Sequence, residues 1–266
     1  MFLADYHTHT LCSPDSSAPL AQMAQAALDA GMDELCTTDH CDLLTLDGKL
    51  DLSFQWAPIE AQLAQVRPLF AGHLPIRMGL ELGEAWEAPQ KALEIAGHPE
   101  LDFILGSVHN LSRAAGGQDF YFVNYQNDDE CYAALDDYFH SMTLLAEMDC
   151  YDVLAHIIYP LRYMERDGCH ITLERYEDQL RRIFRTVIGK GKGIEVNTCR
   201  GRNISDWRSI LALYKDCGGE IITLGSDAHE PGDVAKGIPA AAELMQEMGF
   251  SHLAVYEKHQ PQMRKL

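Results

Sequence analysis

The 266-residue sequence has little positive charge. Against 40 Asp and Glu residues there are only 21 Lys and Arg residues, so the formal net charge is −19. Proteins that bind nucleic acids are usually basic, because contacts to the phosphate backbone dominate their affinity. We therefore expect no long nucleic acid as a partner.

The sequence also lacks long hydrophobic runs and a basic leader. No segment approaches the roughly 20 consecutive apolar residues that a membrane span needs, and the first residues, Met-Phe-Leu-Ala-Asp-Tyr-His, carry no basic group. Cys-x-x-Cys pairs are absent as well: the eight cysteines are scattered along the chain. These absences predict a cytoplasmic protein with reduced thiols, no membrane partner and no disulfide framework.

What the sequence does contain is an apolar fraction of 47% and alternating strand and helix patterns. This size and composition suit one domain over residues 1–266. We expect strands over 2–6, 34–38, 76–80, 103–107, 152–155, 193–197, 221–225 and 252–256. We expect helices over 18–30, 57–66, 89–96, 128–148, 173–188, 205–217 and 234–248. The first helix is expected to be capped by Ser16 or Ser17 and to end at Gly31.

Three segments without a clear period are expected to be loops. They cover residues 41–55, residues 110–127 and an Arg-rich stretch that ends at Asp167. Alternating strands and helices predict a parallel sheet with right-handed crossovers, and about seven such units close into a distorted (β/α)7 barrel. A doubly wound open sheet is the alternative.

Histidines and carboxylates follow the apolar runs, one or two to each run. They are His7 and His9, Asp15, His40, Glu81, His109, His156, and Asp227 and His229. The C-terminal ends of neighbouring parallel strands converge, so these side chains are expected to meet at one barrel mouth. An open sheet would not bring the first and the last of them together, which favours the barrel.

The spacing of two of these pairs suits chelation. In His7-x-His9 and Asp227-x-His229 the two side chains fall on one face, because side chains alternate with a period of two along a strand. Imidazole and carboxylate donors suit Zn, Mn or Fe. The sequence therefore predicts a multinuclear metal site with two or three divalent ions.

The ordered motifs resemble one family. Asp-x-His-x-His, Thr-Asp-His, Gly-x-Glu, Ser-Val-His, Leu-Ala-His and Ser-Asp-Ala-His occur in this order between Asp5 and His229. The set is similar to that of the polymerase-and-histidinol-phosphatase (PHP) superfamily of metal-dependent phosphoesterases. The resemblance implies a distorted seven-unit β/α barrel with a trinuclear cluster.

The resemblance also implies which residues bind each ion. The first ion is assigned to His7, His9, Glu81 and Asp227, and the second to the bridging Glu81 with His109 and His156. The third ion is assigned to Asp15, His40 and His229; a binuclear site is the alternative, because position 15 varies between His and Asp in the family. Asp15, Glu81 and Asp227 are the expected catalytic carboxylates, and Asp5 and Asp39 are candidates to accept hydrogen bonds from ligand imidazoles.

Three arginines are expected to bind the substrate phosphate. Arg162 follows the strand that precedes His156, and Arg200 and Arg202 follow the strand that ends at Asn197. A phosphate monoester carries about two negative charges, which guanidinium groups complement. Three divalent ions against three carboxylates also leave the site at about +3, so an anionic substrate is compatible with an acidic protein.

Within the family, the chain resembles the members that hydrolyse L-histidinol phosphate to L-histidinol and phosphate in histidine biosynthesis. The similarity lies in its length, in the long loop after Ser-Val-His and in Pro231-Gly232-Asp233-Val234. Three alternatives stay open: a phosphoesterase acting on nucleotides or short oligonucleotides, a metal-dependent amidohydrolase, and a non-enzymatic metal-binding module. An amidohydrolase usually has a bridging Lys at a strand end, and none of the expected strands ends in Lys.

Overall fold

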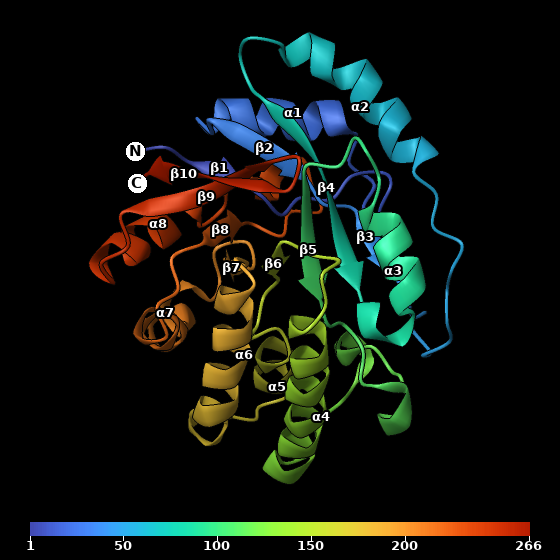
Figure 1. Ribbon diagram of the computed structural model, residues 1–266, viewed down its shortest axis with the longest axis vertical. Helices are drawn as coiled ribbons and strands as arrows, with labels where there is room; N and C mark the ends of the chain where they lie inside the picture. Colours follow the sequence, from blue (N-terminus) through green and yellow to red (C-terminus); the bar gives the residue numbers. More distant parts are fainter.

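The computed structural model describes residues 1–266 and has parallel strands surrounded by helices (Figure 1). The strands are β1 (Ala4–Asp5), β2 (Glu34–Thr37), β3 (His40–Asp42), β4 (Ile76–Gly83), β5 (Phe103–Ser107), β6 (Val153–Leu154), β7 (Gly193–Asn197), β8 (Ile222–Gly225), β9 (His252–Glu257) and β10 (Gln260–Lys265). The α-helices are α1 (Leu20–Asp29), α2 (Ala57–Phe70), α3 (Pro89–Ala96), α4 (Asp128–Ala146), α5 (Leu161–Arg166), α6 (Glu177–Gly189), α7 (Trp207–Asp216) and α8 (Ile238–Glu247). Short 3-10 helices are η1 (Ala85–Glu87), η2 (Arg113–Ala115), η3 (Phe120–Phe122), η4 (Glu174–Tyr176), η5 (Ile204–Asp206) and η6 (Pro231–Asp233).

The strands form a nearly closed barrel with seven parallel positions, as predicted. Their order is β1-β2-β4-β5-β6-β7-β8, and β3 continues β2 by pairing with the later part of β4. Between β8 and β1 the barrel closes through a parallel bridge of Thr8 with Ala228 and a hydrogen bond from Tyr6 N to Leu224 O of 2.8 Å. Residues that follow the first and the last barrel strand are therefore neighbours.

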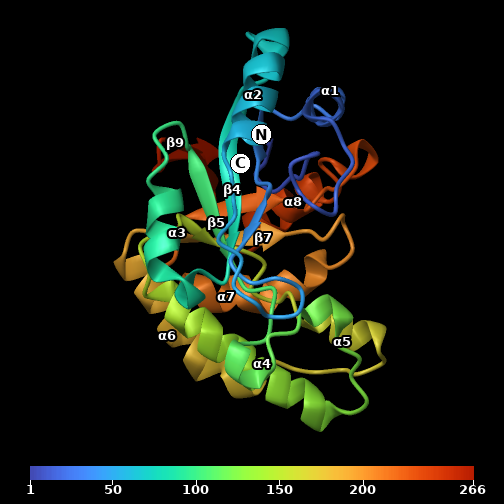
Figure 2. The same cartoon turned by 90° about the vertical axis from the view of Figure 1, so that its right-hand side faces the viewer.

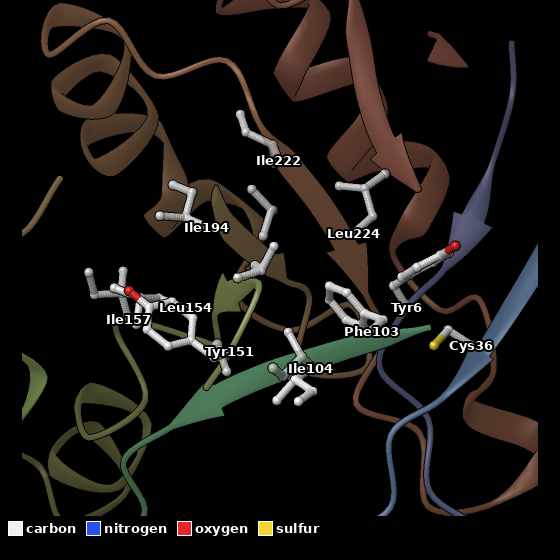
Figure 3. Packing of buried hydrophobic residues seen from close by; sticks show 14 of the residues in the cluster. Tyr6, Cys36, Phe103, Ile104, Tyr151, Leu154, Ile157, Ile194, Ile222 and Leu224 are labelled. Carbon is white, nitrogen blue, oxygen red and sulfur yellow. The ribbon is translucent and has the colours of Figure 1, made fainter. Parts of the chain in front are cut away.

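Parallel strands covered on both faces are expected to be apolar throughout. In β5 and β8 every residue is buried, and all are apolar except Ser107 and Thr223. Tyr6 and Phe103 meet edge to face inside the barrel with ring centroids 5.1 Å apart, close to Leu224 (Figure 3). The outer helices are amphipathic; α6, for example, buries Leu180, Ile183, Phe184 and Val187 at helical spacing.

A C-terminal hairpin lies at the end of the barrel where the strands begin. β9 pairs antiparallel with β10, and the backbone N–H of His259 in their turn donates to Asp102 O at 2.9 Å. His259 Nδ1 also lies 2.9 Å from the carboxylate of Asp152. Because Asp102 and Asp152 precede β5 and β6, the hairpin covers the end of the barrel opposite to the strand ends that hold the histidines.

Every helix and strand expected from the sequence is present, and 89–96, 103–107 and 193–197 have the expected ends while the others are shifted. Besides the short 3-10 helices, two strands and one α-helix were not expected. β3 lies at the border of the expected 41–55 loop, α5 lies in the expected Arg-rich loop, and β10 follows the last expected strand. The expected cap of α1 is also wrong: Pro19 occupies the N-cap position, and Ser16 Oγ donates instead to His229 O at 2.8 Å. Gly31 does end α1, with a left-handed φ of 74°.

The helices lie on opposite sides of the barrel strands (Figure 1, Figure 2). α1 and α2 lie at one side of the strands, α4, α5 and α6 lie at the opposite side, and the two chain ends lie next to each other, with Phe2 N donating to Lys265 O at 3.1 Å. None of the helices combines the length and the apolar character that crossing a membrane requires.

Candidate metal centre

The nine predicted ligand residues meet at the C-terminal ends of the barrel strands. Six lie two or four residues after the end of a strand, and β3 and β4 themselves carry His40 and Glu81. The β3–β4 register places His40 directly beside Glu81. Only Asp15 comes from farther along a loop, and its side chain is 54% exposed at the outer edge of the group.

Glu81 lies at the centre of this group and is 1% exposed. Its Oε1 is 3.0 Å from His109 Nε2 and 2.7 Å from His156 Nε2. Its Oε2 is 3.0 Å from His7 Nε2 and 3.6 Å from His9 Nε2. His40 Nδ1 also lies 3.3 Å from Oε2. The two carboxylate oxygens thus face different imidazoles, which is the arrangement a bridging ligand would require.

A second set of side chains surrounds the ring of His9. The rings of His40 and His229 both stack against it, with ring centroids 4.4 Å and 4.0 Å away. Asp15 Oδ2 closes this set at 2.9 Å from His229 Nε2 and 3.7 Å from His40 Nε2. The nitrogen donors of His9, His40 and His229 lie within 4.8 Å of one another, so His9 faces both sets.

Asp227, in the turn after β8, faces His7 and His9. Its Oδ1 lies 3.6 Å from His9 Nε2 and 3.9 Å from His7 Nε2. The backbone of Asp227 is left-handed, with φ of 61°, a region that Asp tolerates better than most residues but that remains uncommon outside glycine. The turn after β8 therefore adopts a costly conformation at the residue that directs a carboxylate into the cluster.

Several imidazoles are oriented from outside the cluster. Ligand histidines in proteins usually use one ring nitrogen for the metal and the other for a hydrogen bond. Four of these histidines use Nδ1 in this way and direct Nε2 inward: His7 to Glu195 (2.7 Å), His9 to Ser13 (3.0 Å), His109 to Asp42 (2.9 Å) and His229 to Asp227 O (3.0 Å).

The donor set suits a divalent transition metal. Nitrogen and carboxylate oxygen atoms gather in groups of three within 4.8 Å, and the buried Nε2 of His9 has no hydrogen-bond partner in the protein. An unpaired buried polar atom is costly unless a ligand satisfies it. These residues therefore fit a metal centre.

Electrostatics within the cluster couple the histidines to the carboxylates. Burial lowers the pKa of His7 and His109, but the neighbouring charges of Glu195, Glu81 and Asp42 outweigh burial and raise both above the ordinary value. Burial acts against protonation of His40 too, yet nearby carboxylates raise its pKa to about 9. Without metal, protons on these rings thus supply positive charge to the carboxylates.

Comparison with known families identifies the family of the chain. The model of the PHP domain family matches residues 5–199. The chain belongs to the PHP domain family. The match covers seven of the nine predicted ligands, and Asp227 and His229 lie beyond it.

Relatives of the chain include named histidinol-phosphatases. The histidinol-phosphatase of Lactococcus lactis is 25% identical over 260 residues, covering 95% of this chain and 93% of the relative. A probable histidinol-phosphatase of Deinococcus radiodurans is 29% identical, with coverage of 93% and 94%. A crystal structure of the Lactococcus lactis histidinol phosphate phosphatase, in complex with zinc, L-histidinol and phosphate, superposes with a TM-score of 0.82 at 24% identity and covers 98% of both chains.

The three predicted phosphate-binding arginines differ in their surroundings. Arg162, in α5, donates from NH1 to Asp227 Oδ2 at 3.1 Å, and its buried Nε has no partner in the protein. Arg200 faces Asp233 at 3.9 Å, and Arg202 donates to Cys199 O at 3.0 Å. Arg162 thus directly contacts a predicted metal-ligand residue, Asp227. Arg200 and Arg202 contact residues that are not predicted metal ligands.

The two carboxylates expected to orient imidazoles act on other groups. Asp5 accepts hydrogen bonds from the backbone N–H groups of Ser226 and Ala235, both at 2.9 Å, so its predicted contact with a ligand imidazole is wrong. Asp39 accepts from Ser13 Oγ at 2.8 Å and therefore acts on His9 only through that hydroxyl.

Two carboxylates that do orient ligand imidazoles were missed. They are Asp42, which lies 2.9 Å from His109 Nδ1, and Glu195, which lies 2.7 Å from His7 Nδ1. Glu195 had a signal in the sequence, because a glutamate in the middle of the otherwise apolar strand Gly193–Asn197 must be paired when it is buried. Asp42 had none, since the segment after His40 reads as a polar loop.

Proposed function

We propose that this protein is a metal-dependent phosphatase that hydrolyses L-histidinol phosphate to L-histidinol and phosphate, a step of histidine biosynthesis. The observation that carries the proposal is the convergence of nine histidine and carboxylate side chains, with Glu81 at their centre and Arg162 beside them. Relatives that align over nearly the whole chain are named histidinol-phosphatases, which supports the choice of substrate.

The proposed centre binds two or three divalent ions of Zn, Mn or Fe. The first site comprises His7, His9, Glu81 and Asp227, the second Glu81, His109 and His156, and the third Asp15, His40 and His229. The zinc in the Lactococcus lactis structure supports zinc among the three metals. Bound divalent ions lower the pKa of water and neutralise the charge on phosphoryl oxygens, the two requirements of monoester hydrolysis at neutral pH.

Arg162 is the proposed phosphate-binding residue with the clearest geometry. Its side chain is only 14% exposed, and Asp227 and the ring of Tyr159, 4.8 Å from its guanidinium carbon, fix its position. Charge-assisted hydrogen bonds from a guanidinium group to phosphoryl oxygens are strong, and the Nε of Arg162 has no partner in the protein. We propose that water held by the ions, or Asp15 and its neighbours at the cluster edge, would supply the proton to the departing alkoxide.

An aromatic surface leads outward from the cluster and suits the imidazole of L-histidinol. The ring of Tyr159 lies 4.8 Å from that of His156, Tyr163 lies 5.0 Å from Tyr159, and Tyr121 lies 5.7 Å from Tyr163. Tyr121 is 56% exposed and belongs to the 110–127 loop. Aromatic faces favour planar rings and cations, and L-histidinol carries an imidazole and an ammonium group.

We also infer that residues 1–266 act as one domain. The family match ends at residue 199, but the cluster requires Asp227 and His229 from the turn after β8. The buried apolar side chains form a single cluster of 77 residues, which includes residues from both sides of position 199.

The proposal is tested by phosphate release from a panel of monoesters. The purified protein is loaded with zinc or manganese, and L-histidinol phosphate is compared with adenosine 5′-monophosphate, phosphoserine and glycerol phosphate. We expect the highest kcat/KM for L-histidinol phosphate and no turnover by His9→Ala. Turnover of the other esters with L-histidinol phosphate left untouched would contradict the substrate assignment.

A further inference from the structure

Glu195 lies behind the cluster, on β7, and is 1% exposed. Its Oε1 is 2.7 Å from His7 Nδ1, and the side-chain amide of Asn197 donates to the same oxygen at 3.2 Å. Its Oε2 accepts a hydrogen bond of 2.8 Å from the backbone N–H of His156. One carboxylate therefore contacts a ligand of the proposed first ion and the backbone of a ligand of the proposed second ion.

The neighbouring strand leaves room for this carboxylate only because it ends in glycine. Gly225 of β8 pairs with Asn197 of β7. A Cβ atom at position 225 would lie 2.1 Å from Glu195 Oε1 and 2.4 Å from His7 Cβ. Both atoms are confined in the barrel interior, so any larger residue at position 225 must displace Glu195 or His7.

We propose that Glu195 is a positioning residue of the metal centre and that Gly225 provides the space it needs. A carboxylate accepts hydrogen bonds but does not donate them when ionised. Glu195 thus holds His7 with the Nδ1 proton directed outward and with Nε2 available to an ion. Through the N–H of His156 it also fixes the distance between the ligands of two ions.

The proposal rests on the metal centre described under the proposed function, and it goes beyond that function by assigning a role to residues that are not ligands. The competing interpretation is that Glu195 only satisfies buried donors of the fold. The two interpretations differ in what they predict for His7 when Glu195 is replaced. A role limited to folding predicts no specific change of the His7 imidazole.

The decisive variant is Glu195→Gln. The amide has the shape of the carboxylate but only one acceptor oxygen, whereas three donors surround this side chain. Either orientation of the amide directs an NH₂ group at a donor. We expect zinc affinity, measured by competition with a chromogenic chelator, to fall roughly 10–100-fold, the range typical of residues that orient metal ligands.

Two further measurements separate positioning from folding. In the zinc-loaded wild-type protein the Nδ1 proton of His7 should give a downfield NMR resonance, which Glu195→Gln should shift or abolish. Glu195→Asp keeps an acceptor with a shorter reach, so we expect it to retain the resonance and to bind zinc more tightly than Glu195→Gln. Thermal unfolding of the metal-free proteins reports separately on the fold.

Glycine variants provide a matched comparison. Gly225→Ala should weaken zinc binding as Glu195→Gln does, because the added methyl group occupies the space of Glu195 Oε1. The control is Gly189→Ala at the end of α6, where nothing lies within 4 Å of the added Cβ, and it should bind zinc as the wild type does. If Glu195→Gln does not fold, Gly225→Ala takes its place in the test.

Wild-type zinc affinity in folded Glu195→Gln, or an unchanged His7 resonance, would overturn the proposal. The same conclusion follows if Glu195→Asp binds zinc no better than Glu195→Gln. Because zinc binding is measured without substrate, a wild-type protein that binds zinc but leaves L-histidinol phosphate intact would contradict the proposed function while leaving this inference standing.

Discussion

At the scale of single residues, Arg162 offers a direct test of phosphate binding. We expect Arg162→Ala to lower kcat/KM for L-histidinol phosphate roughly 10–100-fold, because a hydrogen bond to a charged group contributes about 1.5–3 kcal/mol. Arg200→Ala and Arg202→Ala should have smaller effects, since Asp233 and Cys199 already engage their guanidinium groups. Steady-state kinetics of the metal-loaded variants measures these differences.

A matched control for this series is Arg208→Ala. Arg208 lies on α7, is paired with Glu247 at 2.6 Å and is 57% exposed. Removing an exposed pair should leave kcat/KM unchanged. If Arg162→Ala behaved like Arg208→Ala, Arg162 would have no part in phosphate binding.

The ligand residues were easier to predict from the sequence than the residues that orient them. Each proposed ligand except Asp15 lies at or near a strand end in a short motif, and strand ends converge in any parallel barrel, so their meeting follows from topology. Asp42 and Glu195 act through distances set by tertiary packing, which no local pattern records. Asp5 was predicted wrongly for the same reason: its place beside His7 in the sequence does not reveal that it points toward the backbone of the turn after β8.

At the scale of elements, hydrogen bonds from Arg166 of α5 hold part of the 110–127 loop in place. Arg166 donates to Tyr121 O at 2.8 Å and to Val123 O at 2.6 Å, and its Nε donates to Asp167 at 2.8 Å. We expect Arg166→Ala to release this part of the loop and to raise KM several-fold, because Tyr121 belongs to the proposed imidazole-binding surface. Zinc content should stay at the wild-type level, since Arg166 contacts no proposed ligand.

Kinetics and metal analysis of the same Arg166→Ala preparation check this prediction. Limited proteolysis gives an independent readout, because a loosened loop should be cut faster within residues 110–127. An unchanged KM together with an unchanged cleavage rate would show that the loop is held by other contacts.

The C-terminal hairpin provides a prediction about stability. The hydroxyl of Tyr6 donates to Glu34 and accepts a hydrogen bond of 2.8 Å from the backbone N–H of Tyr256 in β9, and all three residues are buried. Tyr6→Phe would leave a buried donor and a buried carboxylate without this partner. We expect the free energy of unfolding to fall by about 1–3 kcal/mol, measured by urea denaturation.

The control for Tyr6→Phe is Tyr121→Phe, which removes an exposed hydroxyl that makes no hydrogen bond to the protein. Its unfolding free energy should match that of the wild type. Equal stability of Tyr6→Phe and the wild type would mean that the hairpin is held by its apolar contacts alone.

Two strands and one α-helix were not expected from the sequence, each for a physical reason. β10 follows a turn at Lys258 and His259, both with positive φ, where hairpin turns usually show Asn or Gly. α5 has only six residues, too few for an apolar period to stand out. β3 resumes the line of β2 after a break at Thr38 and Asp39, and it exists because β4 is long enough to pair with both segments.

At the scale of the whole molecule, net charge and local charge act in opposite directions. The chain carries −19, yet the buried carboxylates Glu81 and Asp227 face histidines, and Asp227 also faces Arg162; these groups lower both pKa values despite the effect of burial. The carboxylates of the centre therefore remain ionised and available to cations. Metal binding would reverse the local sign, so that an anionic substrate meets a cationic site in an acidic protein.

Metal affinity of the whole protein should therefore depend on pH, and the sign follows from the histidine pKa shifts. The pKa values of His7 and His109 are raised, and that of His40 lies at about 9, because neighbouring carboxylates outweigh burial. At neutral pH these rings hold protons that a divalent ion must displace. Affinity should thus increase with pH up to about pH 9, by about tenfold per pH unit for each proton displaced.

Chelator competition between about pH 6 and pH 9 measures this dependence, and calorimetry in buffers of different ionisation enthalpy counts the protons released. His170→Ala should leave the slope unchanged, because His170 is exposed and lies outside the cluster. Zinc affinity that stays constant across this range, with no proton release, would mean that the imidazoles are already neutral in the metal-free protein. The negative charges of the carboxylates around Glu81 would then repel one another with no protonated imidazole between them, and this repulsion would lower the stability of the metal-free protein.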